Sequence, residues 1–143
     1  MPYRYRDDIA IADAAFEAWG GSKEEMFSAC ADALLNVMVD DPAVVRPDQI
    51  LEVRLENDSL EMLLFDFLNE LIFFKDARRL LLRVASIVIT RNGDTYSLRA
   101  TLQGELVDRL QDSLHADVKA VTLYRFRVEE RDGAWRAEVV LDI

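Results

Sequence analysis

The sequence places two aspartates where strand-like segments would expose them on one face. Asp13 interrupts the alternating segment of residues 9–19, and Asp142 lies in the closing run EVVLDI. By the two-residue alternation of strands, both side chains project from the face opposite the helices. Ile143 adds a terminal carboxylate beside Asp142. Calcium and magnesium prefer such oxygen ligands, so these three residues form a candidate metal site. The alternative, two solvated surface aspartates, is the one that periodicity alone favours.

The sequence lacks the motifs of nucleotide-binding loops, zinc sites and hydrolase active sites. There is no GxxxxGK[ST] loop, no GxGxxG and no HExxH, and the chain has one histidine and one cysteine. Cys30 falls in the apolar stripe of an expected helix, which indicates packing and not a reactive thiol. His115 lies in a polar loop, where a lone histidine is usually exposed. A zinc centre or a hydrolase triad is therefore not expected, and we predict that the chain is not an enzyme.

Composition and charge limit the class of protein. The chain has 143 residues, of which 51% are hydrophobic, so we expect one domain over residues 1–143 with a sizeable core. A net charge of -10 argues against direct nucleic-acid binding and suits a basic protein surface or cations as partners. The polar opening MPYRYRDD carries no apolar signal, which predicts a cytoplasmic protein, and no segment is long and apolar enough to span a membrane.

The elements that must position these residues surround one central helix, predicted over residues 57–79. Its leucines and phenylalanines recur at three- and four-residue steps and cover most of its circumference. Asp58 is the expected cap, with Glu61 in the capping-box position. Ahead of it we expect a strand over residues 9–19, a helix from Ser22 to about Met38, and a short strand over residues 50–55.

Two hairpins follow the central helix. Residues 80–91 and 94–103 are predicted to pair around Asn92-Gly93, and residues 104–117 to form a long irregular loop. Residues 118–143 form a last hairpin that turns at Asp132-Gly133.

The two-residue turn of the last hairpin sets its register. It places Arg127 opposite Glu138 and Asp142 opposite Leu123. Lys119 then lies four residues further along, roughly 13 Å from the position opposite Asp142, which is too far for an ion pair.

The element order predicts the fold class. Strand, helix, strand, helix and then four strands imply a two-layer α+β fold, in which two helices pack on one face of a mainly antiparallel sheet.

Four segments in this order resemble the archease family of small acidic proteins that assist a tRNA-splicing RNA ligase. They are ADAAFEAWGGSKEEMFSACADALLNVMVD, LLFDFLNELIFFKDARRL, GELVDRLQDSLHADVKAVT and DGAWRAEVVLDI. Each is weakly specific alone, but the four together cover most of the chain.

The resemblance implies a function and a site. Asp13, Asp142 and Ile143 fall on family positions that bind a divalent cation, expected to be calcium, with magnesium and manganese as alternatives. Lys119 falls on the family's strand lysine, for which we expect a partner contact. The implied role is a non-catalytic activator that promotes guanylylation of the ligase's own histidine and repeated turnover.

The chain also departs from the family pattern. The usual histidine and threonine before the first Ala-Asp pair are Ala10 and Ile11, and the usual tyrosine and histidine after VKAVT are Leu123 and Tyr124. The family's loop histidine is Asp112. A second function class therefore stays open, a binding or chaperone-like module on the same scaffold without ligase activation. A small hydrolase comes third, because it needs a cleft with a perturbed acid.

Overall fold

The computed structural model describes residues 2–8 and 13–143, which form two α-helices, seven strands and two short 3-10 helices. The first part of the chain holds β1 (Tyr3–Tyr5), β2 (Ala14–Gly20), α1 (Lys23–Met38), η1 (Pro42–Val44), β3 (Gln49–Asn57) and α2 (Leu60–Arg78). The second part holds β4 (Leu80–Asn92), β5 (Thr95–Leu106), η2 (Val107–Ser113), β6 (Ala120–Arg131) and β7 (Ala134–Asp142).

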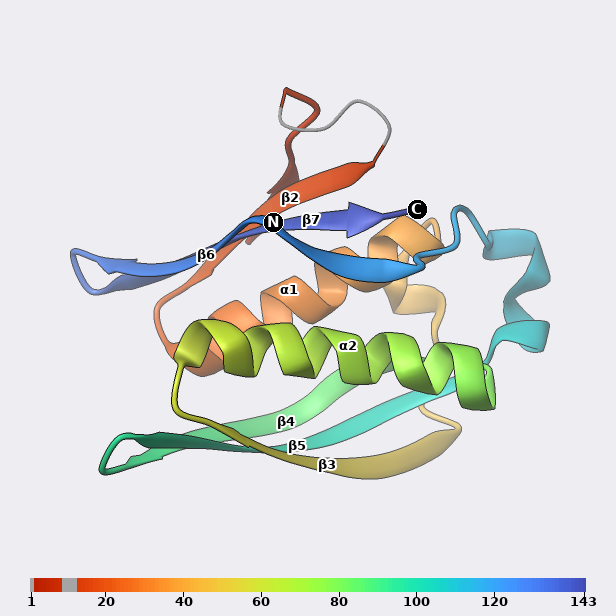
Figure 1. Cartoon of the computed structure of the whole chain (residues 1–143). Helices are drawn as coiled ribbons and strands as arrows, with labels where there is room; N and C mark the ends of the chain where they lie inside the picture. The colour runs from red at the N-terminus through yellow and green to blue at the C-terminus, as the bar shows by residue number, and fades with distance from the viewer. Residues whose placement is uncertain (1, 9–12) are drawn as a thin grey trace.

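The α+β class is confirmed, and every strand pairing is antiparallel. The strands divide into two sheets, however, where one was predicted. Their orders are β1-β2-β7-β6 and β3-β5-β4, and both helices lie between them (Figure 1). The reason is visible in α2, which is apolar around most of its circumference. A single sheet would cover only one side of it, and the second sheet buries the other.

The first helix begins as its sequence predicts. The Ser22 side chain caps α1 by accepting a hydrogen bond from the Glu25 backbone N–H at 3.1 Å. The Glu25 carboxylate in turn accepts from the Gly21 N–H at 2.9 Å, one residue earlier than in the standard capping box.

The cap predicted for the central helix is wrong by one residue. Ser59 accepts from the Met62 N–H at 3.1 Å and caps α2, while Asp58 accepts from the Thr95 hydroxyl at 3.0 Å. At the other end Arg79 adopts a left-handed conformation, and its N–H donates to the Lys75 carbonyl at 3.0 Å. This turn ends α2 and leads directly into β4.

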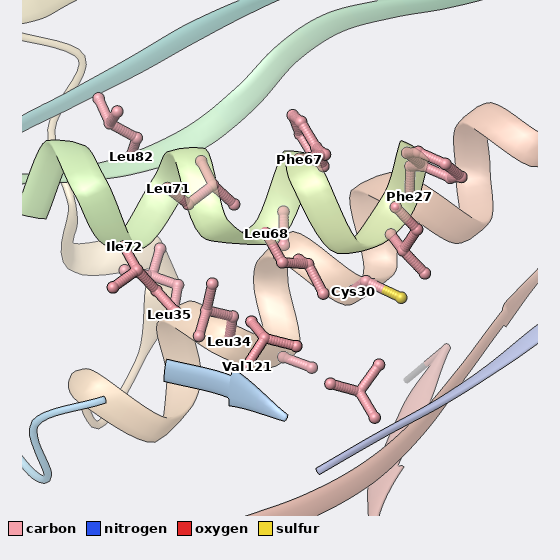
Figure 2. Packing of buried hydrophobic residues seen from close by; sticks show 14 of the residues in the cluster. Phe27, Cys30, Leu34, Leu35, Phe67, Leu68, Leu71, Ile72, Leu82 and Val121 are labelled. Carbon is pink, nitrogen blue, oxygen red and sulfur yellow. The ribbon is translucent and has the colours of Figure 1, made fainter. Parts of the chain in front are cut away.

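The core fills the space between the two helices and the sheets. Phe27, Cys30 and Leu34 of α1 meet Phe67 and Leu68 of α2, and all five side chains are at most 1% exposed (Figure 2). The complete burial of Cys30 in this cluster confirms its expected role in packing, and the same burial raises the pKa of its thiol.

Both hairpins form, with differences in register. The turn after β4 is made by Gly93 and Asp94, since Asn92 still pairs with Thr95; the predicted turn was one residue early. The last hairpin turns at Asp132-Gly133 as predicted.

The register of the last hairpin changes along its length. Arg127 pairs with Glu138 as predicted, but residues 123–126 of β6 stand against Val139 alone in β7. Arg125 takes a left-handed conformation within this bulge, at φ 54°. As a result Ala120 pairs with Asp142, and the predicted pairing of Asp142 with Leu123 is wrong.

Two further segments differ from the sequence-based expectation. Tyr3–Tyr5 form an additional strand against β2, and the predicted loop of residues 104–117 begins with the end of β5 and continues into η2. Of the predicted strand over residues 9–19, the part from Ala14 is observed as β2, and Asp13 lies in a bend before it; residues 9–12 lie outside the described part of the chain. In that described part no helix is long and apolar enough to cross a membrane.

Candidate functional site

The two predicted aspartates lie at the same end of neighbouring strands. β2 and β7 are antiparallel, and Ala14 pairs with Leu141. Asp13 lies in a bend just before β2, and Asp142 is the last residue of β7, so the two residues flank this last pair of the register. Both side chains are exposed. The β2–β7 pairing therefore brings the backbones of Asp13 and Asp142 to the same end of the sheet.

A pocket of about 270 Å³ opens beside this strand end. Asp13 and Ile143, two of the three predicted ligands, line it, whereas Asp142 does not. The remaining walls come from β1 and the residue pair after it, the start of β2, the last turns of α1, and the chain after η2, through Tyr5, Asp7, Ala14, Ala15, Asn36, Val37, His115 and Ala116.

His115 reaches this pocket because its backbone is fixed to the end of α1. The N–H of His115 donates to the Met38 carbonyl at 2.8 Å, and the N–H of Ala116 donates to the Val37 carbonyl at 3.1 Å. The imidazole is exposed as predicted, with Nδ1 3.4 Å from a carboxylate oxygen of Asp40. The local sequence did not predict that His115 lies at this pocket, because its position depends on how the chain after η2 bonds to the end of α1.

The opposite wall is held by Tyr5 and Asn36. The Tyr5 hydroxyl donates to the Ala33 carbonyl at 2.9 Å and lies 3.2 Å from the Asn36 amide oxygen. The Asn36 amide nitrogen donates to the carbonyls of Val39 and Asp40. Partial burial, together with the nearby Tyr3, raises the pKa of Tyr5, so the phenol remains a donor at neutral pH. These bonds join β1 to the end of α1.

Lys119 lies next to Asp142, contrary to the sequence-based expectation. Its N–H donates to the Asp142 carbonyl oxygen at 2.8 Å, and its side chain is exposed. The predicted separation of roughly 13 Å assumed a regular hairpin, and the bulge at residues 123–126 removes it. A cationic side chain thus begins within one residue of the aspartate pair.

A buried lysine anchors the segment that leads to Lys119. The Lys75 ammonium on α2 donates to Asp117 at 2.6 Å and to the Val118 carbonyl at 2.7 Å, and it lies 2.7 Å from Asp76. Burial alone lowers the pKa of Lys75, but the hydrogen bonds to Asp117 and Asp76 outweigh that effect, so the net pKa is raised. Lys75 is therefore charged, and it ties the entrance of β6 to the central helix.

Comparison with known proteins places this geometry in a family. The model of the Archease protein family (MTH1598/TM1083) matches residues 3–143. The chain is 35% identical to a protein archease of Pyrococcus abyssi over 133 residues, 92% of this chain and 93% of that protein. It is 33% identical to a protein archease of Methanopyrus kandleri over 132 residues, 92% of this chain and 94% of that protein. The chain belongs to the archease family.

Solved structures agree with this assignment. The solution structure of Methanobacterium thermoautotrophicum protein 1598 superposes with a TM-score of 0.85 at 30% identity and covers 99% of both chains. A crystal structure from Thermotoga maritima, described as an archease and possible chaperone, has a TM-score of 0.65 at 21% identity and covers 94% of this chain and 93% of that one. At that identity it supports the fold alone.

In this archease fold, only some of the predicted cation ligands lie together. Asp13 and Asp142 flank the same end of the β2–β7 pair, and Asp13 shares the pocket with Ile143. Asp7 lines the same pocket and was missed by the sequence analysis, since it lies in a polar stretch with no periodicity. Within residues 2–8 and 13–143, no group of three or more His, Cys, Asp and Glu side chains has an arrangement that could hold a metal ion. Asp7, Asp13 and Ile143 thus line one pocket, and Asp142 lies outside its lining.

Proposed function

We propose that this archease-family chain is a non-catalytic, divalent-cation-dependent activator of a tRNA-splicing RNA ligase in the cytoplasm. It acts by promoting guanylylation and repeated turnover of the ligase. Family membership supports the class of protein. The observation that supports the cation dependence is the β2–β7 pairing, which brings the backbones of Asp13 and Asp142 to the same exposed strand end.

The proposed cation ligands are Asp13, Asp142 and the terminal carboxylate of Ile143. Carboxylates gathered around one point repel one another, which opposes the packing of the strand end. A bound calcium, magnesium or manganese ion would neutralise that repulsion. Because the protein offers few oxygens here, water would complete the coordination, and we expect modest affinity.

Lys119 is proposed to contact the ligase. Its side chain is exposed beside the aspartate pair, and Lys75 fixes the preceding segment through Asp117 and Val118. The cation would order the strand end, and Lys119 would present a positive charge at the edge of the same surface. The activator contributes no reacting group in this proposal, and the guanylylated histidine belongs to the ligase.

The test is a ligation assay with the RNA ligase from the same cell at substoichiometric amounts. We expect the parent protein to raise the number of turnovers and Asp142→Ala to lose most of that effect. Asp94→Ala is the matched control, because Asp94 lies in the β4–β5 turn and carries the same charge. Equal stimulation by the parent and Asp142→Ala would refute the cation site, and no stimulation by the parent would refute ligase activation.

A second candidate is a binding or chaperone-like module without ligase activation. The observation that favours it is an exposed apolar pair in the β6 bulge, where Leu123 is 60% and Tyr124 63% exposed. Such side chains suit a protein contact. Suppression of aggregation of an unfolded client, lost in a Leu123→Ser and Tyr124→Ser double variant, together with no stimulation in the ligation assay, would favour this function over the first.

A further inference from the structure

Arginines concentrate on the outer face of the four-stranded sheet, although the chain as a whole is strongly acidic. A hollow of about 330 Å³ on this face is lined by eight charged residues and by no other kind. We call it the arginine hollow. Its five arginines are Arg4, Arg6, Arg127, Arg131 and Arg136.

Three glutamates lie among these arginines, and two of them form the centre. Glu17 pairs with Glu138 across β2 and β7, so two like charges stand directly opposite each other. In the same strand register, Arg4 lies opposite Glu17 on one side, and Arg127 lies opposite Glu138 on the other. Across the sheet, from β1 through β2 and β7 to β6, the four residues in this row are therefore Arg4, Glu17, Glu138 and Arg127. Opposed glutamates are tolerated only because guanidinium groups surround them.

Glu17 holds the guanidinium groups in place. It is only 5% exposed, and it forms ion pairs with Arg4, with Arg6 at 3.3 Å and with Arg136 at 4.0 Å. One carboxylate has two oxygens and therefore satisfies few of the fifteen or so N–H donors that three guanidinium groups carry. The remaining donors stay available, and Arg4 and Arg136 are more than half exposed.

The charges of the hollow do not balance. Five guanidinium groups face three carboxylates, because Glu129 is the third glutamate of the lining. Arg6 also pairs with Asp8 and holds the pKa of that carboxyl at about 2, so Arg6 is the most fully compensated of the five. Arg131, in contrast, has no ion pair within the described part of the chain. The positive charge that no carboxylate offsets therefore lies mainly on the β6 and β7 side of the hollow.

We propose that the arginine hollow binds a compact phosphate anion, such as the diphosphate or triphosphate group of a nucleotide. Guanidinium groups form bidentate hydrogen bonds with phosphate, and phosphate carries more charge in less volume than a carboxylate. At physiological salt, charges beyond about 8 Å are largely screened, so the acidic remainder of the surface does not prevent binding of a small ion. A long RNA strand or an acidic peptide would extend over that acidic surface and be repelled, which favours the compact anion.

The proposed phosphate site is separate from the aspartate pair but lies on the same face. Along β2 and β7, Glu17 and Glu138 are four residues from Asp13 and Asp142, roughly 13 Å at strand rise. The intervening pair, Ala15 and Val140, is apolar and buried. Phosphate binding here does not depend on the proposed ligase activation, and it can be measured without any divalent cation.

Calorimetry with tripolyphosphate, at physiological ionic strength and with EDTA present, tests the proposal. We expect the parent to bind, and the double variant Arg127→Ser and Arg131→Ser to bind at least tenfold more weakly. The matched control is Arg54→Ser with Arg99→Ser, which removes two arginines that pair with each other on the outer face of the other sheet. Its affinity should equal that of the parent.

Further probes define the ligand. A nucleoside triphosphate should bind to the parent as well as tripolyphosphate does and should bind more weakly to the Arg127→Ser and Arg131→Ser double variant, because both ligands offer the same phosphate chain. No binding by the parent, or equal weakening in the control variant, would overturn the proposal. Citrate or a single-stranded RNA without a terminal phosphate binding as tightly as tripolyphosphate would also overturn it, since neither offers a compact phosphate chain.

Discussion

Lys119 and Asp142 are joined by a backbone hydrogen bond of 2.8 Å, from the Lys119 N–H to the Asp142 carbonyl oxygen. The bond fixes the residue before β6 to the end of β7, at the end of the sheet where Asp13 precedes β2. A positively charged side chain therefore starts at the same end of the sheet as the proposed cation site. Its charge opposes cation binding, whatever it contributes to a partner.

The first prediction follows from this arrangement. Lys119→Ala leaves the backbone bond intact and removes one positive charge. Two unit charges 4 Å apart interact by about 1 kcal/mol in water, so we expect calcium affinity to rise by about fivefold at most and not to fall. Stimulation of the ligase should decrease in the same variant. Calcium titration calorimetry and the ligation assay measure the two effects.

The control for Lys119 is Arg78→Ala, which removes an exposed positive charge from the end of α2. It should change neither calcium affinity nor stimulation. Loss of calcium binding in Lys119→Ala would contradict the division of roles between Lys119 and the aspartates.

The second prediction concerns the aspartates themselves. Calcium or magnesium should raise the melting temperature of the parent, because a ligand that binds only the folded state stabilises it. Asp13→Ala and Asp142→Ala should each abolish this increase without unfolding the protein, since both side chains are exposed. Residues appended after Ile143 should weaken the increase, because the terminal carboxylate becomes a peptide.

Thermal denaturation with and without each cation measures this effect. Asp94→Ala serves as the charge-matched control and should respond to the cation like the parent. An equal increase in melting temperature in the parent and in the double aspartate variant would show that the cation binds elsewhere or binds nonspecifically.

Local signals were enough to predict most of the elements. Ser22 with Glu25 marked the start of α1, and Asp132-Gly133 marked the last turn, because each signal acts over a few residues. The division into two sheets was not predictable in this way. Whether β2 pairs with β7 or with another strand is decided by burial of α2 from two sides, and no short segment encodes that choice.

The candidate cation site stays a prediction, and only part of its surroundings could be read from the sequence. Strand alternation needs only a period of two, and it is the basis on which Asp13 and Asp142 were predicted to share a face. The bulge that brings Lys119 to Asp142 depends on the left-handed backbone conformation of Arg125. The sequence does not predict this conformation, because positive φ is uncommon for a residue other than glycine. The approach of His115 to the pocket likewise depends on bonds between segments distant in sequence.

The third prediction concerns the core. Phe67 and Leu68 lie in the middle of α2 and are fully buried (Figure 2). Phe67→Ala or Leu68→Ala should each lower the free energy of unfolding by about 3 kcal/mol through lost burial and a residual cavity. Phe73→Ala is the control on the same helix, since Phe73 is 55% exposed, and it should cost about 1 kcal/mol or less. Denaturant titration would contradict a central role for α2 if both buried sites lost under about 1 kcal/mol.

The last prediction concerns Lys75, which ties α2 to the segment before β6. Lys75→Met removes the hydrogen bonds to Asp117 and to the Val118 carbonyl. Asp76 and Asp117 are mostly exposed and remain solvated, so the loss falls mainly on the carbonyl left without its donor. We expect a cost of about 1–3 kcal/mol, the range for an unsatisfied buried polar group. Arg78→Met, at an exposed position one turn further on, should cost about 0.5 kcal/mol or less.

The pH dependence separates this role of Lys75 from simple packing. Folding raises the pKa of Lys75, so the stability it contributes is complete below the pKa of the unfolded chain. It declines above that value and is lost as pH rises through the still higher pKa of the folded state. The difference in unfolding free energy between the parent and Lys75→Met should therefore be constant from pH 7 to about pH 9 and shrink above the ordinary lysine pKa of about 10.4. A difference that stayed constant to pH 11.5 would mean that the ammonium charge does not contribute and that the methylene chain of Lys75 alone stabilises the fold.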